Sequence, residues 1–289
     1  MERHPGVSPA GAQSGRALRP PARTTHRSAS SHGAWYWAAA GALVGLLWAT
    51  LQWAPAVWLQ RAAYKASNGR LALSDSRGTI WQGSAELALT GGPGSSDAAR
   101  LPGRVQWDLR PGLDGMQLLL RLRLHADCCT AQAQELSFRP GLRSWRLQLA
   151  AGDSTWPAAL LTGLGTPWNT VQLQGPLLFH TDGLNLVSAV DRLRVEGSMQ
   201  LDLPALASSL STLRPLGSYR LQLQGGEQAT LELQTLQGSL QLKGSGRWTA
   251  AHLRFEGEAR AEAEHEAELS NLLNIMGRRD GARSRITLG

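Results

Sequence analysis

The chain contains 289 residues, of which 42% are hydrophobic, and this length allows one or two domains with a sizeable core. The formal net charge is +7, but residues 1–33 hold five basic residues and one acidic residue, which leaves 24 basic and 21 acidic residues in residues 61–289. Because the Lys and Arg residues of this nearly balanced part form no cluster, the composition argues against nucleic-acid binding.

Residues 1–33 are predicted to be a disordered basic tail on the cytoplasmic side of a membrane. They are rich in Pro, Ala, Ser and Gly, a composition that cannot bury enough apolar surface to fold. Their arginines precede an apolar segment, and basic residues beside such a segment favour the cytoplasmic side. These arginines are Arg3, Arg16, Arg19, Arg23 and Arg27.

Residues 34–60 are predicted to form a single transmembrane helix. No charged residue lies between Ser28 and Gln60, and the 25 residues Trp35–Leu59 are almost wholly apolar. At about 1.5 Å per residue, they cover the roughly 30 Å hydrocarbon core of a bilayer. A cleaved signal peptide has a shorter apolar region of about 7–15 residues, so an uncleaved anchor is favoured. Residues 61–289 then lie beyond the membrane.

Two features of this span predict its behaviour. Gly41 and Gly45 share one helix face, and this spacing lets two helices approach closely and associate. Pro55 predicts a kink or a loosened last turn, because its ring clashes with the preceding turn. The helix is expected to continue as far as Ser67, where an Asn-Gly pair provides a C-terminal stop.

Residues 61–289 are predicted to be mainly β. Seven segments alternate apolar residues with polar or small ones, which is typical of antiparallel strands with one packed face and one solvated face. They are Leu118–Leu124, Arg146–Leu149, Leu193–Leu203, Tyr219–Gln224, Thr230–Gln234, Ser239–Lys243 and His252–Ala261. Turns are predicted at Gly225-Gly226, Gly238 and Gly244–Gly246, so the last third is expected to be a meander of hairpins.

Few helices are predicted beyond the span. Apolar residues at i, i+3, i+4 and i+7 indicate a short helix from Leu269 to Met276, closed by Gly277 and covering one end of a sheet. A second short helix is expected at Ala205–Leu213. The stretch Gly91–Ala99 is expected to be a flexible loop.

No catalytic, cofactor-binding or metal-binding residue is assigned. The sequence after His265 lacks the second histidine of a zinc-protease helix, and neither a Gly-x-Ser-x-Gly motif nor a phosphate loop occurs. A dense acidic run permits acid–base chemistry or cation binding, but a solvated strand leading into a helix N-terminus is the favoured interpretation. The run consists of Glu256, Glu258, Glu262, Glu264, Glu266 and Glu268. Three histidines near strands, His125, His180 and His252, are interpreted as core or surface residues.

The two cysteines, Cys128 and Cys129, are adjacent. In an oxidising compartment they can form a vicinal disulfide, or each can stay free. The two-residue spacer of redox motifs is missing. Because successive side chains of a strand point to opposite faces, one buried thiol and one exposed thiol are favoured.

Several short stretches stand out in order along the chain: Gly78–Gly83, Trp107–Pro111, Pro215–Tyr219, Thr235–Leu240, Gly244–Trp248 and Leu272–Gly281. Together they resemble protein N of the bacterial type II secretion system, the general secretion pathway N family, over roughly residue 43 to the end. The resemblance implies an inner-membrane, single-pass protein with a periplasmic β-rich domain, accessory to a machine that exports folded proteins across the outer membrane. It also implies kinship with the AsmA-like group of curved, open β-sheets. No cofactor is expected, because no cofactor-binding residue is found.

Each of these stretches also has a purely structural interpretation. Glycines are needed where a turn requires positive φ, tryptophans fill cores, and arginines are favourable near the C-terminus of a helix. This interpretation is favoured over ligand contact for all of the residues concerned. They are Gly78, Gly83, Trp81, Trp248, Arg278 and Arg279.

Three functions follow from these observations. The favoured one is a non-catalytic subunit that is tethered by the helix and docks other inner-membrane subunits of the secretion system through its β domain. The alternative is a lipid-handling protein that binds phospholipid along an apolar sheet face. The third, a membrane-anchored hydrolase dependent on Glu262 or His265, ranks lowest. An unpaired edge strand is a further expected docking site, by strand addition.

Overall fold

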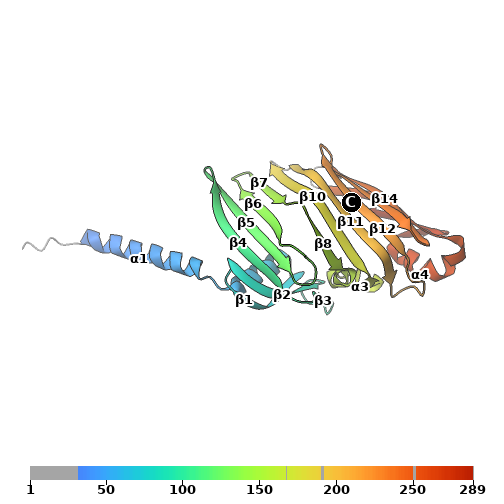
Figure 1. Cartoon of the computed structure of the whole chain (residues 1–289), viewed down its shortest axis with the longest axis horizontal. Coiled ribbons are helices and arrows are strands. Elements are labelled where there is room, and N and C mark those ends of the chain that lie inside the picture. Colours follow the sequence, from blue (N-terminus) through green and yellow to red (C-terminus); the bar gives the residue numbers. More distant parts are fainter. Residues whose placement is uncertain (1–31, 167, 190–191, 250–251, 289) are drawn as a thin grey trace, which may run out of the picture. The chain divides into compact units, whose positions relative to one another are not determined.

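The computed structural model describes residues 32–166, 168–189, 192–249 and 252–288 (Figure 1). The tail predicted for residues 1–33 lies outside this part apart from its last two residues. The chain divides into two compact units, one ending at Ala49 and the other beginning at Thr50.

The first unit contains most of helix α1 (His32–Gln52), an apolar helix without acidic residues in its first turn or basic residues in its last. Its aromatic and aliphatic side chains are exposed, among them Trp37 and Trp48. Across the part of the chain that the structure describes, none of the helices combines the length and apolarity that crossing a membrane requires.

The helix does not run unbroken through residues 34–60. Helix α1 ends at Gln52, and a second helix, α2 (Ala56–Ala66), begins after Pro55. The break falls at Pro55 because proline has no N–H to donate and its ring obstructs the preceding turn. Pro55 instead forms a bridge with Thr79. Helix α2 stops before the predicted Asn-Gly pair, where both residues adopt positive φ, 51° and 76°.

The second unit is built on 17 antiparallel strands. The first of them are β1 (Leu71–Gly78), β2 (Gln82–Thr90), β3 (Ala98–Arg100), β4 (Val105–Asp114), β5 (Gln117–Ala126), β6 (Gln134–Pro140), β7 (Ser144–Leu149) and β8 (Gly152–Pro157). The others are β9 (Leu173–Gln174), β10 (Pro176–Ala189), β11 (Arg192–Ser208), β12 (Gly217–Gly226), β13 (Thr230–Gln237), β14 (Leu240–Thr249), β15 (His252–Ala261), β16 (Arg278–Asp280) and β17 (Arg283–Leu288). Short helices are η1 (Ala158–Leu164), α3 (Trp168–Val171), η2 (Ala263–His265) and α4 (Glu266–Met276).

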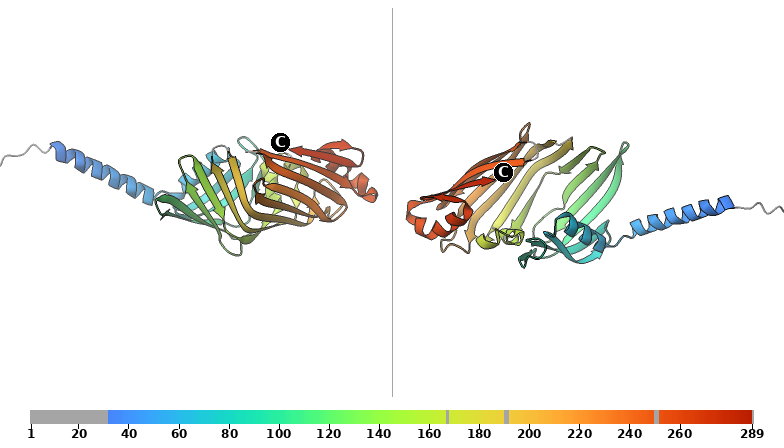
Figure 2. Two further views of the ribbon diagram at one scale, coloured as in Figure 1. Left: turned by 90° about the horizontal axis from the view of Figure 1, so that it is seen from above. Right: turned by 180° about the vertical axis from the view of Figure 1, so that it is seen from behind.

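The strands follow a meander, in which most strands pair with the next one along the chain. The departures are local: β3 and β4 both pair with β2, β7 and β8 both pair with β10, β9 pairs with β11, and β17 lies between β15 and β16. Figure 2 shows the resulting curved sheet from two further sides. The predicted mainly β, antiparallel fold is confirmed, and each of the seven predicted segments falls on an observed strand.

Alternation along the strands gives the sheet two chemically different faces. One register row, on what we call the apolar face, runs through Leu109, Leu122, Leu136, Leu149 and Leu184. The neighbouring row, on what we call the polar face, runs through Arg110, Arg121, Ser137, Gln148 and Asn185. Since side chains in a strand alternate in direction, a fixed register keeps these rows on opposite sides of the sheet.

The largest core lies where helix α4 packs on the sheet. Leu269, Leu272 and Leu273 are fully buried there, at most 1% exposed, which confirms the helix predicted over these residues. They pack in one cluster with Tyr219, whose hydroxyl donates to the carbonyl of Leu240 over 3.0 Å. Burial raises the pKa of Tyr219 well above its ordinary value, so this hydroxyl stays a donor.

Two local predictions are wrong. The helix expected at Ala205–Leu213 is absent, because strand β11 continues to Ser208 and Leu206 pairs with Gly217 of β12. The turn expected at Gly244–Gly246 is instead the middle of β14, where these glycines leave room for the ring of Phe255 on β15.

Candidate functional surfaces

A hollow of about 320 Å³ opens on the polar face over β4, β5, β6 and β7. Its charged side chains alternate along adjacent strands, so the register brings them to one side of the sheet. They are Asp108, Arg110, Arg121, Arg123 and Glu135. The hollow therefore combines three guanidinium groups with two carboxylates.

Two of the three arginines in this hollow are paired. Arg110 donates from Nε and Nη2 to the two oxygens of Asp108, at 2.8 Å each, and Arg123 reaches Glu135 at 2.7 Å. The bond from Arg110 lowers the pKa of Asp108, so this carboxylate stays charged. Arg121 is exposed, and within the described residues it takes part in no ion pair. Its guanidinium is therefore available to an anionic group.

A second hollow, of about 390 Å³, shares Asp108 and Arg123 with the first. It also contains His125, which the sequence analysis interprets as a core or surface residue. The Nδ1 of His125 lies 3.0 Å from the hydroxyl of Thr130, and its Nε2 lies 4.0 Å from Asp127. Since Thr130 belongs to the turn after β5, His125 helps to hold that turn.

The apolar face is less well covered than the core under α4. Side chains of the middle strands on this face are only half-buried, namely Leu120, Leu122, Leu136, Phe138, Leu147 and Leu149. Helix α2 packs on β1 and β2, and α4 packs on β15, β16 and β17. The leucine-rich row of the middle strands is therefore only partly covered by the rest of the chain.

Cys128 and Cys129 form a disulfide, so the favoured prediction of two separate thiols is wrong, whereas its expectation of one buried and one exposed residue is confirmed. The prediction assumed a strand, but both residues lie in the turn after β5, where strand alternation does not apply. The N–H of Cys129 donates to the carbonyl of Ala126 over 2.9 Å. Cys129 packs against Leu101 and Leu160, whereas Cys128 is exposed.

The acidic run does not converge on one point. Glu258 reaches Arg283 at 3.3 Å, Glu266 reaches Arg279 at 3.6 Å, and Glu268 lies 3.9 Å from His265. Three of the six carboxylates thus have their own, separate basic partners. In the described part of the chain, no group of three or more His, Cys, Asp or Glu residues is arranged to hold a metal ion.

His180 has partners that the sequence analysis did not find. Its Nδ1 lies 2.6 Å from Asp153 and its Nε2 lies 3.3 Å from Asp182, and Ser198 donates to Asp182 over 2.7 Å. The bond to Asp153 is the main cause of a raised pKa at His180. These hydrogen bonds link β8, β10 and β11. Because Ser198 donates to the carboxylate of Asp182 and not to the imidazole of His180, the group lacks a nucleophile–base contact. His252 begins β15.

The Gly78–Gly83 stretch forms the turn between β1 and β2. Gly78 adopts positive φ, 88°, as predicted, whereas Gly83 does not and is instead packed against Trp107. Trp81 is half-buried, and its Nε1 donates to the carbonyl of Leu51 over 2.9 Å. This stretch therefore joins the sheet to the residues that end α1.

Other residues singled out from the sequence have structural positions. Trp248 is half-buried and packs against a cluster around Leu184 and Val195. Arg279 follows α4 and donates to Asn274 over 3.2 Å. Its neighbour Arg278 is exposed on β16.

Gly41 and Gly45 lie on α1, and a Cβ added at either position would meet nothing within 4 Å. Strand β17 forms one edge of the sheet. Strand β16 pairs only with Arg283–Arg285 of β17. Among the described residues, Ile286–Leu288 is therefore paired on one side only, with β15.

Comparison with known families gives one result. A family model described as type II secretion system (T2SS), protein N, matches residues 69–287. The match begins just after α2 and includes every strand, to within one residue of the end of β17. Nothing among the curated proteins or the solved structures matches the chain.

Proposed function

Because this chain belongs to the type II secretion system protein N family, whose members are components of that secretion machine, we propose that it serves the machine as a non-catalytic docking subunit. The observation that carries this proposal is the charged hollow on the polar face, with Arg121 unpaired between two arginines that are paired. Three carboxylates of the acidic run, those of Glu258, Glu266 and Glu268, have separate basic partners, which supports a role in assembly.

The docking partner is another inner-membrane subunit that presents an acidic group. Arg121 lies directly opposite Arg110 on one side and Ser137 on the other. A carboxylate entering the hollow would meet a guanidinium and a hydroxyl, and both can donate charge-assisted hydrogen bonds to it. An exposed edge such as Ile286–Leu288 offers strand addition as a second mode of contact.

The tether is α1, placed in the inner membrane with the N-terminus in the cytoplasm and the sheet in the periplasm. The absence of charge between Ser28 and Gln60 and the arginines before it support this orientation. The disulfide between Cys128 and Cys129 supports an oxidising compartment for the sheet. Protease added to intact spheroplasts should then digest the sheet and spare the N-terminal tail. Protection of the sheet would contradict this topology.

Self-association through α1 is a further part of the proposal. Gly41 and Gly45 leave space beside the helix backbone, which a second helix can fill. Cross-linking of the membrane-embedded chain should fall when both glycines are replaced by leucine. Unchanged cross-linking would exclude this contact.

The docking proposal is tested by reversing the charge of Arg121. The variant Arg121→Glu should reduce both the co-purification of inner-membrane secretion subunits and the export of folded proteins by a strain that depends on this chain. The matched control is Arg254→Glu on β15, because Arg254 is also an exposed strand arginine but lies outside the hollow. Equal losses in both variants would show that net charge, and not the hollow, matters.

A second candidate function is lipid binding, and the half-buried leucines of the middle strands favour it. An acyl chain laid along Leu122, Leu136 and Leu149 would cover a row that the chain itself leaves half-exposed. Purified full-length protein should then carry phospholipid in fixed ratio, and Leu136→Glu should remove it. Protein free of lipid after gentle extraction would exclude this function.

A further inference from the structure

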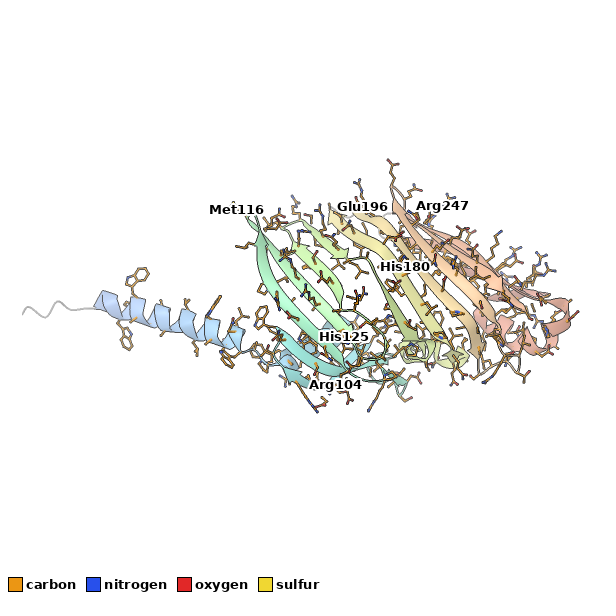
Figure 3. All side chains as sticks on the ribbon, viewed as in Figure 1. Arg104, Met116, His125, His180, Glu196 and Arg247 are labelled. Carbon is orange, nitrogen blue, oxygen red and sulfur yellow. A yellow bond between two sulfur atoms is a disulfide. The ribbon has the colours of Figure 1, made fainter. Side chains whose placement is uncertain are left out.

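Two neighbouring hairpin tips carry large apolar side chains that the fold does not bury. At the turn between β4 and β5, Leu113 is 76% exposed and Met116 is 101% exposed. At the turn between β6 and β7, Leu142 is 106% exposed and Trp145 is 38% exposed. We call these two turns the apolar tips; Figure 3 shows Met116 at the free end of its hairpin.

The register brings the two apolar tips together. Leu120 of β5 pairs with Phe138 of β6, and both strands reach their tips a few residues beyond this pair. The Phe138 and Trp145 rings lie 6.4 Å apart, on the side of β6 and β7 nearest the tip. The exposed side chains therefore form one apolar end of the sheet, contributed by adjacent hairpins.

These residues are not explained by the turns themselves. Turn formation favours Gly, Asn, Asp and Ser, and a Leu or Met at the tip adds nothing to that geometry. Burying such apolar side chains is favourable, so leaving them in water forgoes that stabilisation. A cluster of this kind marks a surface that contacts an apolar partner.

The charges around the tips are predominantly positive. Arg139 pairs with Asp114 at 3.2 Å, which neutralises both. Arg143 and Arg146 are exposed, and neither forms an ion pair with the described residues. The tips thus present apolar side chains at their ends, with cations and a tryptophan just behind them. This order matches a phospholipid leaflet, in which the acyl chains lie deeper than the anionic headgroups.

The tips also lie at the same end of the strands as the turn between β1 and β2, which contacts Pro55. The carbonyl of Trp81, in the turn after β1, accepts from the N–H of Leu109 over 2.6 Å, and Thr79 in the same turn bridges to Pro55. Beyond Leu109, which contacts this turn, strand β4 runs on to Leu113. At roughly 3.3 Å per residue, this places Leu113 about 13 Å past the turn. The tips therefore extend beyond the residues that follow the apolar helix.

We propose that the apolar tips dock onto an anionic phospholipid bilayer and so give the sheet a membrane contact separate from α1. Leu113, Met116 and Leu142 would enter the headgroup region, with Arg143 and Arg146 on the lipid phosphates. The contact would hold the sheet at a fixed orientation to the bilayer. This inference does not depend on the secretion subunits, so it can fail while the docking proposal stands.

The test uses the full-length chain reconstituted into vesicles of phosphatidylethanolamine and phosphatidylglycerol. A bimane label is attached at Leu142→Cys under non-reducing conditions, which keep the Cys128–Cys129 disulfide closed. Brominated lipids quench a label that touches the acyl region. The control label is at Thr212→Cys, because Thr212 is also exposed but follows β11 at the opposite end of the strands.

Quenching at residue 142 and not at residue 212 is the expected result. Arg143→Gln and Arg146→Gln should each weaken docking to the vesicles about 5-fold, because each removes one positive charge. Met116→Asp should abolish the quenching. Since Met116 is fully exposed, its replacement leaves the fold intact, which circular dichroism checks. Equal quenching at both positions, or shielding of residue 142 only after secretion subunits are added, would overturn the proposal.

Discussion

Gly83 on β2 lies close both to the backbone of β1 and to the Trp107 ring. A Cβ added at Gly83 would lie 2.5 Å from the carbonyl oxygen of Arg77 and 2.5 Å from Cζ2 of Trp107. Trp107 is only 6% exposed, and its Nε1 donates to the carbonyl of Thr79 over 3.2 Å. Neither neighbour can move freely, so Gly83→Ala must separate β1 from β2 or displace the ring.

The expected cost is that of overpacking a core, about 1–3 kcal/mol in the free energy of unfolding. For a unit of this size, each kcal/mol lowers the melting temperature by about 2–4 °C. We therefore expect Gly83→Ala to melt about 2–12 °C below the parent protein, as followed by the β-sheet circular dichroism of the full-length chain in mild detergent.

The matched control is Gly112→Ala on β4. Gly112 does not have positive φ, and the nearest atom to a Cβ there is the carbonyl oxygen of Leu119 at 3.8 Å. Alanine at this position should be neutral or slightly stabilising, because it restricts the unfolded chain. If Gly83→Ala melts no lower than Gly112→Ala, the close packing of β1, β2 and Trp107 described above is wrong.

Two further predictions concern the core under α4 and the hydrogen bond between His180 and Asp153. Leu272→Ala should lower the free energy of unfolding by about 2–5 kcal/mol, because it leaves a cavity between α4 and the sheet. Asn271→Ala, at an exposed position of the same helix, should leave that free energy unchanged. Chemical denaturation of the two variants compares them. The raised pKa of His180 means that its bond to Asp153 stabilises the fold below about pH 6.5 and weakens as pH rises through the raised pKa. Asp153→Asn should lower the pKa of His180 in an NMR titration; an unchanged pKa would exclude Asp153 as its cause.

The seven strand segments predicted from the sequence all alternate apolar with polar or small residues. Strand β10 was missed because a bulge between Thr181 and Gly183 shifts the register, so apolar residues change face within one strand. Strand β2 was missed for another reason. Its buried positions are small, as at Ala85, because the Trp107 ring of β4 fills the space there.

The candidate surfaces were harder to predict than the fold. The alternation of Arg121 and Arg123 was visible in the sequence, but the hollow also needs Asp108 and Glu135, which only the register of β4, β5 and β6 brings beside them. The histidine chain likewise joins residues on three strands, so no spacing in the sequence indicates it.

The cysteine pair shows the opposite case, in which a rule was applied outside its range. The rule that neighbouring side chains face opposite sides holds within strands, and the chain turns at Asp127, one residue before Cys128. Adjacent cysteines in a turn are free to bond to each other, as they do here.

The docking role is tested most directly by purifying the full-length protein from its own membranes in mild detergent and identifying both the proteins and the lipids that accompany it by mass spectrometry. Inner-membrane subunits of the secretion system in a fixed ratio, lost in Arg121→Glu and retained in Arg254→Glu, are the expected result. Stoichiometric phospholipid without those subunits would contradict the docking role and favour lipid binding on the apolar face.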